Sequence, residues 1–218
     1  MIIYNGKESL KDFDLYVASK DIPPPQRKTI TETVPYMSGI WDFSFNEGVD
    51  EYEPLPLKYT FDVIADTKQE LNSIKAELLD WLHNIGSDNE DIRKRLYDTD
   101  ISETEYYEVY FVNTGWSEEG LQGLLTAEFV CYPFRKTESR TITHTINNSL
   151  SLNLENAGYR PIYPIITVSE AVTISDGINS FSISAGTYTD FLQLKKGSNA
   201  LTITGSGSIS ITLWEERL

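Results

Sequence analysis

The chain has 218 residues, of which 40% are hydrophobic and 23% are charged, as in soluble globular domains. One cysteine and two histidines exclude an internal disulfide and a histidine-rich metal site. The net charge of −15 disfavours binding to nucleic-acid phosphates, and no apolar run is long enough to span a membrane. The N-terminal residues have no basic region followed by an apolar core, so we expect no signal peptide and a reducing site of synthesis.

The charge is unevenly distributed along the chain. Residues 1–135 carry 26 acidic and 12 basic residues (net −14), whereas residues 136–218 carry seven and six (net −1). The composition also becomes rich in Ser, Thr and Asn after Lys136. These changes predict a first domain at 1–136, a linker at 137–149 and a second domain at 150–218.

The first domain begins with short extended segments. Met1–Tyr4 is predicted as a strand that ends at an Asn5-Gly6 turn, and an apolar run continues to Val17. Three prolines make Ile22–Gln26 an extended connection. Thr29–Val34 is rich in β-branched residues and is predicted as a strand.

The clearest periodic pattern in the chain lies between residues 57 and 86. Leu57–Val63 alternates apolar and polar residues and is predicted as a half-buried strand. An amphipathic helix follows, with Asp66 as N-cap, Gln69 three residues later and Gly86 after the last turn. Its apolar stripe, which we expect to pack on a sheet, consists of Leu71, Ile74, Leu78, Trp81, Leu82 and Ile85.

Three further strands complete the predicted first domain. They are Arg93–Tyr97, Tyr106–Asn113 and Leu124–Tyr132, the last two separated by a glycine-containing loop. Cys131 shares a face with apolar residues of its strand, so we expect a buried thiol and not a nucleophile.

The second domain contains only short strands separated by turn signals, which predicts a β-sandwich or jelly roll. The predicted strands are Leu150–Leu154, Ile162–Val168, Ala171–Ser175, Asn179–Ile183, Tyr188–Leu194, Ala200–Gly205 and Ser208–Glu215.

No recognised catalytic, nucleotide-binding or metal-binding motif occurs in the sequence. The closest approach to a calcium loop, starting at Asp98, has Glu103 in place of the required glycine. Paired carboxylates are frequent, but 33 acidic residues produce such pairs by chance. The sequence therefore predicts a mainly β protein that is not an enzyme and needs no cofactor or metal.

Several segments, in their order along the chain, resemble the distal tail protein family of long, non-contractile-tailed bacteriophages and their prophages. Each segment alone consists of strands and turns that are common in β-sheet proteins, and the resemblance rests on their order along the chain. The segments are Ile2–Val17, Val34–Ser44, Lys58–Asn84, Phe129–Phe134, Glu155–Ser169 and Gly197–Leu218.

The resemblance implies a structural virion protein at the tail tip, made in the bacterial host cytoplasm and without catalytic activity. Its N-terminal domain, an α+β unit formed by a β-sandwich with one amphipathic helix, would form a hexameric ring. The ring would join the tail tube protein to the tail-associated hub protein. The C-terminal domain, a galectin-like β-sandwich, would project outward as a candidate platform for receptor-binding proteins.

The segment Val34–Phe45 contains four aromatic residues around a Ser-Gly turn: Tyr36, Trp41, Phe43 and Phe45. A closed ring buries the same patch in every subunit, so aromatic residues suit its interfaces. One hypothesis therefore places part of this segment at the ring interface. The alternative places all four aromatic residues in the core of the monomer.

Two other functions remain open at this point. Sandwich domains can bind sugars on exposed aromatic faces, which makes a carbohydrate-binding module the alternative function. The second domain offers Tyr159, Tyr163, Phe181, Tyr188, Phe191 and Trp214 for this purpose. A cell-wall glycosidase would need two carboxylates about 5–9 Å apart across a cleft.

Overall fold

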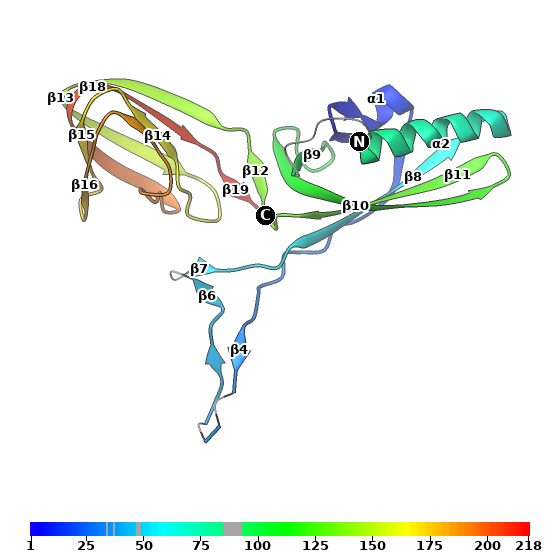
Figure 1. Ribbon diagram of the computed structural model, residues 1–218, viewed down its shortest axis with the longest axis horizontal. Coiled ribbons are helices and arrows are strands. Elements are labelled where there is room, and N and C mark those ends of the chain that lie inside the picture. The colour runs from blue at the N-terminus through cyan, green and yellow to red at the C-terminus, as the bar shows by residue number, and fades with distance from the viewer. Residues whose placement is uncertain (34, 37, 47–48, 85–92) are drawn as a thin grey trace. The chain divides into compact units, whose positions relative to one another are not determined.

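The computed structural model describes residues 1–33, 35–36, 38–46, 49–84 and 93–218, with only the backbone of the short strands β5, β6 and β7. The chain divides into two compact units, Met1–Arg135 and Lys136–Leu218 (Figure 1). Each unit has its own hydrophobic core. The fold is mainly β, as the sequence predicts.

The first unit is built on a mixed set of short and long strands with two helices. In chain order its elements are β1 (Ile2–Tyr4), β2 (Lys7–Glu8), α1 (Ser9–Phe13), β3 (Tyr16–Asp21), β4 (Thr31–Glu32), β5 (Trp41–Asp42), β6 (Phe45–Asn46), β7 (Val49–Asp50), β8 (Leu55–Ile64), α2 (Lys68–His83), β9 (Lys94–Asp98), β10 (Glu105–Glu119) and β11 (Gln122–Cys131). Seven strands of this unit are neighbours in one antiparallel sheet, in the order β2-β1-β9-β10-β11-β8-β3.

Helix α2 covers one face of this sheet. Strand β8 alternates buried and exposed residues along its whole length, and its buried side chains face the helix together with those of β11. The buried side chains of α2 are Leu71, Leu78, Trp81 and Leu82. Burying each of the leucines stabilises the unit by about 1.5–3 kcal/mol. The Trp81 indole N–H also donates to the Tyr4 carbonyl at 2.8 Å, which ties the helix to β1.

The ends of α2 differ from the predicted caps. The N-cap is Thr67 and not Asp66, and its hydroxyl accepts the Glu70 backbone N–H at 3.1 Å. The Glu70 carboxylate in turn accepts the Asp66 N–H, so the capping pair is shifted by one residue from the predicted Asp66 and Gln69. The helix ends at Asn84 in the left-handed conformation. Gly86, the predicted terminating residue, and Ile85 lie outside the described residues.

Two elements of the first unit were not predicted. Helix α1 is a single short turn that the sequence pattern does not distinguish from an extended run. The loop predicted between the last two strands is instead the end of a long β10–β11 hairpin. Its strands pair from Val109 opposite Cys131 to Glu119 opposite Gln122, with a register shift between Phe111 and Asn113. Gly120 takes a positive φ in the tight turn. Polar residues extend both strands here because each finds a cross-strand partner.

The second unit contains only strands, joined to the first unit through β12 (Arg135–Thr137). Its strands are β13 (Arg140–Asn156), β14 (Ile165–Val168), β15 (Val172–Ser175), β16 (Ser180–Ile183), β17 (Gly186–Tyr188), β18 (Gly197–Leu213) and β19 (Glu216–Arg217). The long strands β13 and β18 pair along all of their 17 residues. On its other edge β18 pairs with β15 near its start and with β14 near its end.

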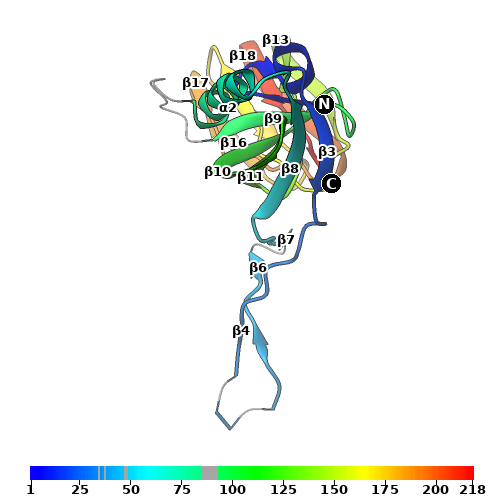
Figure 2. The same ribbon diagram turned by 90° about the vertical axis from the view of Figure 1, so that its right-hand side faces the viewer.

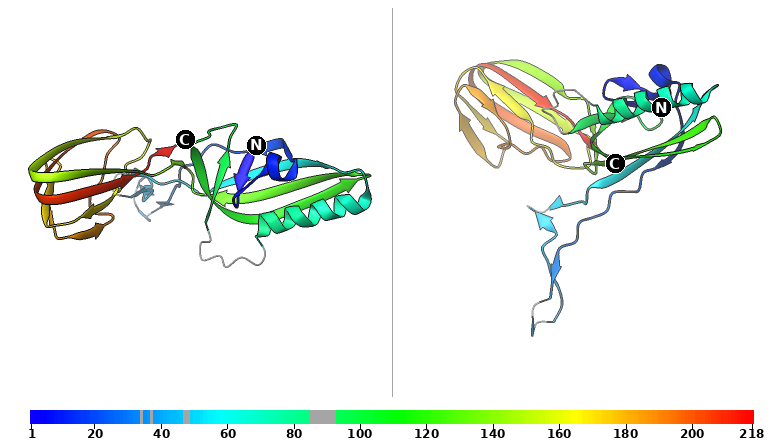
Figure 3. Two further views of the ribbon diagram at one scale, coloured as in Figure 1. Left: turned by 90° about the horizontal axis from the view of Figure 1, so that it is seen from above. Right: turned by 45° about the vertical axis from the view of Figure 1, so that its right-hand side comes forward.

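The long β13–β18 pair bends and contributes to both layers of a sandwich, which Figure 3 shows in its left-hand view. The Arg140 side chain at the start of β13 reaches the carbonyl of Glu155 near its end, at 3.1 Å. Gly205 and Gly207 have positive φ at the bend, and a Cβ on Gly205 would lie 2.9 Å from the Ala171 carbonyl oxygen. Glycine is therefore required where the strand turns from one layer into the other.

Two predictions about this unit are wrong for a shared reason. The segment 205–207 was predicted to separate two strands, yet β18 continues through it as a bent strand. The predicted linker at 137–149 contains the first half of β13, because its alternate residues Ile142 and Ile146 face the core. In both segments β-sheet pairing along the bent hairpin overrides a composition that is typical of loops.

Candidate functional site

A two-stranded arm, residues 22–54, leaves the sheet of the first unit after β3 and returns to it at β8 (Figures 1 and 2). Its two legs are held together by backbone hydrogen bonds. The Lys28 N–H donates to the Glu51 carbonyl at 2.8 Å, and the Glu53 N–H donates to the Gln26 carbonyl at 2.9 Å. Further out, β4 pairs with β5 in antiparallel register. Of the predicted strand Thr29–Val34, the described residues contain only the two residues of β4, and Val34 lies outside the described residues.

The outer part of the arm exposes large apolar side chains. Tyr36 is fully exposed (107%) with a positive φ, Phe43 is 54% exposed, and Ile30 and Ile40 are exposed as well. Ser44 is buried, and its hydroxyl accepts the Ile30 N–H at 2.8 Å. Several large apolar side chains exposed on one arm are typical of a surface that contacts another macromolecule.

The four aromatic residues singled out in the sequence all lie on the arm. Tyr36 and Phe43 are exposed and lie outside the core cluster of the first unit. Trp41 begins β5 and Phe45 begins β6, and the side chains of both are outside the described residues. Their placement at an interface between subunits therefore stays a prediction.

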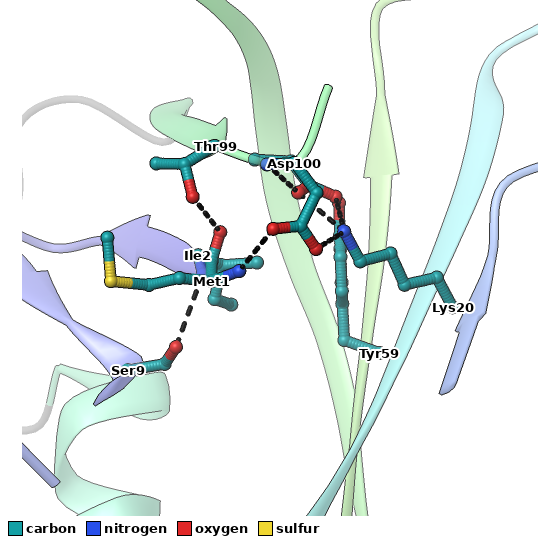
Figure 4. Close-up of polar contacts among 8 residues, drawn as sticks. Met1, Ile2, Ser9, Lys20, Tyr59, Thr99 and Asp100 are labelled. Carbon is teal, nitrogen blue, oxygen red and sulfur yellow. Dashed lines mark hydrogen bonds and ion pairs between the residues drawn. The ribbon is translucent and has the colours of Figure 1, made fainter. Parts of the chain in front are cut away.

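A polar cluster lies at the root of the arm, where β3 ends (Figure 4). The Lys20 ammonium contacts both carboxylate oxygens of Asp98, at 2.6 and 2.8 Å, and one oxygen of Asp100 at 2.6 Å. The Asp98 side chain is only 1% exposed and also accepts the Tyr59 hydroxyl at 3.2 Å. Because β3 and β9 are separated by three strands in the sheet order, this ion pair joins two parts of a strongly curved sheet.

The ionisation of this cluster follows from its contacts. Burial alone lowers the pKa of Lys20, but hydrogen bonds and charge attraction from Asp100 and Asp98 outweigh it and leave the pKa raised. Hydrogen bonds from Lys20 and the N-terminal ammonium of Met1 hold the pKa of Asp100 below its usual value. Burial, with the nearby Asp98 charge, raises the pKa of Tyr59, so its hydroxyl remains a donor. The cluster thus links β3 to β9 through the ion pair between Lys20 and Asp98.

On the sheet face opposite α2, three exposed apolar residues, here called the outer patch, surround the exposed Asp62: Tyr16, Ile64 and Leu124. Tyr16 and Leu124 both lie directly opposite Asp62 in the strand register, and Ile64 follows Asp62 by two residues on the same strand. All three side chains therefore leave the same face. They are 64%, 72% and 40% exposed. A hollow of about 350 Å³ adjoins Leu124 and is otherwise lined by Asp62, Ser117, Glu118, Glu119, Gln122 and Gly123.

The outer faces of the second unit are lined with hydroxyl groups in register. Ser149, Thr204, Thr173 and Ser182 form one row across four strands. The Thr173 and Ser182 hydroxyl oxygens are 3.0 Å apart. A hollow of about 440 Å³ lies on this face, lined by Ala171, Val172, Thr173, Ser182, Ile183, Ser184, Thr204 and Gly205.

Three of the six aromatic residues proposed for sugar binding pack against the core of the second unit: Phe181, Tyr188 and Phe191. Phe181 and Phe191 form an edge-to-face pair with ring centroids 5.7 Å apart, and both pack against the core of the second unit. Tyr188 packs against Phe191 in the same way. Tyr159 is exposed, with the Lys196 ammonium 4.8 Å from its ring centroid. The row of hydroxyl groups, and not an aromatic face, is therefore the polar surface of this unit.

The described part of the chain shows little that could support chemistry. Within it, no group of three His, Cys, Asp or Glu residues is placed to hold a metal ion. The Cys131 thiol is buried, and burial raises its pKa to about 12, as expected for a core residue. None of the helices among the described residues has the length and apolar character needed to span a membrane.

Comparison with known proteins gives a result only at the level of structure. No family model matches the chain, and no curated protein matches it. Among solved structures, the SPP1 Dit (gp 19.1) protein, described as a paradigm of the hub adsorption apparatus in phages that infect Gram-positive bacteria, aligns over 98% of both chains. The TM-score is 0.70 and the sequence identity is 16%.

The chain has the fold of the SPP1 Dit protein. The resemblance to distal tail proteins that the order of segments indicates is thus confirmed for the fold, over both units. A chain of the phage p2 baseplate in its activated conformation with Sr aligns more weakly, with a TM-score of 0.44 and 8% identity over 94% of this chain and 92% of that chain.

Sequence reasoning missed two features of this Dit-like fold. The Lys20–Asp98 pair joins residues 78 positions apart, and no local pattern marks it. The outer patch also combines residues of three strands, although Ile64 could have been noticed as an apolar residue on the polar side of β8.

Proposed function

We propose that this chain is a structural protein of a phage or prophage tail tip, located in the virion, whose first unit assembles into a hexameric ring. The ring joins the tail tube protein to the tail-associated hub protein, and the second unit is available to receptor-binding proteins. The observation that carries this proposal is the end-to-end match of both units to the SPP1 Dit protein. A match over 98% of both chains includes the arm and the second unit as well as the sheet.

The surface of the arm supports assembly independently of that match. Side chains such as Tyr36 and Ile40 remain exposed on an arm that lies outside the core of the first unit. A neighbouring copy that covers them removes apolar area from water, at about 25 cal/mol per Å². In a closed ring this gain is repeated at every interface. Tyr36, Trp41, Phe43 and Phe45 are therefore proposed as interface residues.

The proposal assigns no catalytic step and no cofactor to the chain. Among the residues whose burial is described, the most buried carboxylate is that of Asp98, which is bound by Lys20 and Tyr59 and holds strands together. The cysteine is buried among apolar side chains of the sheet. Both groups are explained by the stability of the fold, which suits a structural role.

The proposed function is tested by the mass of the purified full chain, followed by substitution in the arm. Trp41→Ala and Phe43→Ala are expected to leave a folded protein that no longer forms rings, as measured by native mass spectrometry and negative-stain images. Ile178→Ala, at an exposed apolar residue of the second unit, is the matched control and should leave rings unchanged. Rings of unaltered stability in both arm variants would remove these residues from the interface.

The hydroxyl-lined hollow of the second unit favours one other candidate function, that of a carbohydrate-binding module. Neutral sugars are recognised by hydroxyl groups beside small apolar surfaces, and the hollow offers Thr173, Ser182 and Thr204 next to Val172. Binding of the full chain to a glycan array, lost on Thr204→Val, would support this function. An array without any bound glycan would reject it.

A further inference from the structure

Strand β13 is an open edge of the second unit, all of whose residues the structure describes. Its two halves lie in the two layers of the sandwich, and β18 is the one strand that pairs with it, along all 17 residues. In an antiparallel sheet about half of the backbone amides and carbonyls of such a strand, about eight of each, point away from its single neighbour. The edge strands on the other side of the sandwich, β16 and β17, have only four and three residues. The edge of β13 is therefore the longest surface on which this unit can accept another strand.

The sequence of β13 lacks the features that usually protect an edge strand. Soluble proteins block such edges with prolines, lysines, bulges or short strands. β13 contains no proline and no lysine, and its register with β18 has no shift. Its charged residues are Arg140 and Glu155, near its two ends, and residues 141–154 contain no Lys, Arg, Asp or Glu. No like charges oppose the approach of another strand along this stretch.

The core of the second unit is incomplete along the same edge. The inward apolar side chains of β18, which has neighbouring strands on both sides, are at most 3% exposed. The side chains of β13 alternate in the same way, yet Ile142, Leu150 and Leu152 remain partly exposed although they pack against the core. A strand added beside β13 covers these side chains and also pairs the outward backbone groups.

The pattern of β13 is complementary to itself in antiparallel register. The strand bends at its middle residue, Asn148, which has a φ of 69°. The inward side chains occupy even-numbered positions on both sides of this bend. In an antiparallel pair centred on Asn148, Ile142 lies opposite Leu154 of a second copy. Ile146 lies opposite Leu150 of that copy, so apolar residues meet apolar residues and the two bends coincide.

The charges at the ends of β13 are complementary as well. The Arg140 side chain reaches the Glu155 carbonyl of its own chain at 3.1 Å, so the two ends of the bent strand lie together. The Arg140 guanidinium also lies 3.7 Å from the Glu215 carboxylate, and its side chain is 54% exposed. Antiparallel pairing brings Arg140 of each copy beside Glu155 of the other, whereas parallel pairing places like charges side by side. This match in charge and pattern identifies a second copy of β13 as the partner strand.

We propose that two copies of the chain join along β13 as antiparallel strands centred on Asn148. The contact uses the same surface of both copies, so it is two-fold and closes after two copies. It differs from the head-to-tail contact of the proposed ring and does not rest on it. The even number of copies in the proposed ring allows every second unit to pair.

The contact is tested by a disulfide between copies of the full chain. Thr145 lies opposite Ser151 of the second copy in this register, and both side chains are exposed. Within one copy they leave the outer faces of different layers, about 10 Å or more apart, so they cannot link to each other. The native Cys131 does not compete because its thiol is buried. Mild oxidation of Thr145→Cys/Ser151→Cys should give a linked dimer on a non-reducing gel and no larger product.

The matched control moves one cysteine a single strand away from the edge. Thr202 lies opposite Ser151 on β18 and is exposed on the same face. Thr202→Cys would lie about 10 Å from Thr145→Cys of the second copy, because neighbouring strands are about 4.8 Å apart, and disulfides need Cα atoms within about 7 Å. The linked fraction of Thr145→Cys/Thr202→Cys should therefore be at least about tenfold lower.

A charge on the inward side of the edge tests the same contact without a new disulfide position. His144 belongs to the inward row of β13, is partly exposed, and lies opposite Leu152 of the second copy in the proposed register. Adding His144→Lys to Thr145→Cys/Ser151→Cys should lower the linked fraction at least about tenfold, because pairing encloses the ammonium group. Thr143→Lys, on the outward face of the same strand, should change the linked fraction by less than about twofold.

The outcomes separate this inference from the proposed function. The absence of a linked dimer would overturn the inference, with the edge then open or taken by a strand of another protein. A ladder of linked copies would also overturn it, because it would show a head-to-tail contact, and so would a linked fraction that His144→Lys leaves unchanged. Wild-type rings observed beside any of these results would leave the proposed function intact. A linked dimer from a chain that forms no ring would support the pairing of β13 and contradict the ring.

Discussion

Replacing Lys20 by methionine removes the ammonium group from the root of the arm and keeps most of the length of the side chain. The Asp98 carboxylate is then left 1% exposed, with the Tyr59 hydroxyl at 3.2 Å and the Asp100 N–H at 3.2 Å as its remaining donors. Breaking a buried pair in this way costs about 3–5 kcal/mol. Because Lys20 is partly exposed, we expect a loss near the lower end, about 3 kcal/mol in the free energy of unfolding.

The double variant Lys20→Met/Asp98→Asn provides the control for this prediction. It removes the buried charge together with its partner, so the loss should fall to about 1.5 kcal/mol or less. Urea unfolding followed by tryptophan fluorescence measures both losses. A Trp214→Phe background confines the signal to the tryptophans of the first unit, Trp41, Trp81 and Trp116.

Two results would refute the reasoning about this cluster. A loss below about 1 kcal/mol in Lys20→Met would mean that Asp98 does not need its partner. Strictly additive losses in Lys20→Met, Asp98→Asn and the double variant would mean that the two side chains are not coupled.

Three further predictions concern the core, the bend and the pH response. Leu78→Ala should lower the free energy of unfolding by about 2–5 kcal/mol, whereas Glu77→Ala on the exposed side of α2 should change it by less than about 0.5 kcal/mol. Equal losses in the two variants would mean that α2 is not packed as described. Gly205→Ala should lower the melting temperature of the second unit more than Gly177→Ala does. Both glycines have positive φ, but only at Gly205 would a Cβ meet neighbouring atoms. A larger loss in Gly177→Ala would contradict the bend at Gly205. The pKa of Asp100 is lower in the folded than in the unfolded protein, so its ionised carboxylate stabilises the fold at pH values above the unfolded pKa of about 4. This stabilisation is lost as the pH falls from about 4 through the folded pKa. Asp100→Asn should therefore flatten the acid side of the profile of stability against pH, and an unchanged profile would exclude this contribution.

The parts of the fold that could be predicted from the sequence are those with a strong local period. Strand β8 alternates apolar and polar residues, and helix α2 has apolar residues at helical spacing. For each pattern, only one choice of buried face places the apolar residues in the core. The helix cap shifted by one residue because Asp66 and Thr67 are both good caps, and the choice depends on Glu70, which follows Thr67 by three residues.

The parts that could not be predicted depend on contacts between distant residues. Gly205 and Gly207 are compatible both with a turn and with a bend inside a strand, and only pairing with β13 decides between them. The aromatic segment stands out in the sequence, but its position on an arm depends on pairing between legs whose paired residues are between 9 (Glu32 and Trp41) and 27 (Gln26 and Glu53) positions apart. The outer patch requires the register of three strands, which no single segment encodes.

The most direct test of the proposed assembly is the native mass of the purified full chain. Six copies of a 24.8 kDa chain form a ring of about 149 kDa, with a central opening in negative-stain images. We predict this species for the wild type and its loss in the Trp41→Ala variant. A wild-type protein that remains a 24.8 kDa monomer at every concentration would contradict the proposal.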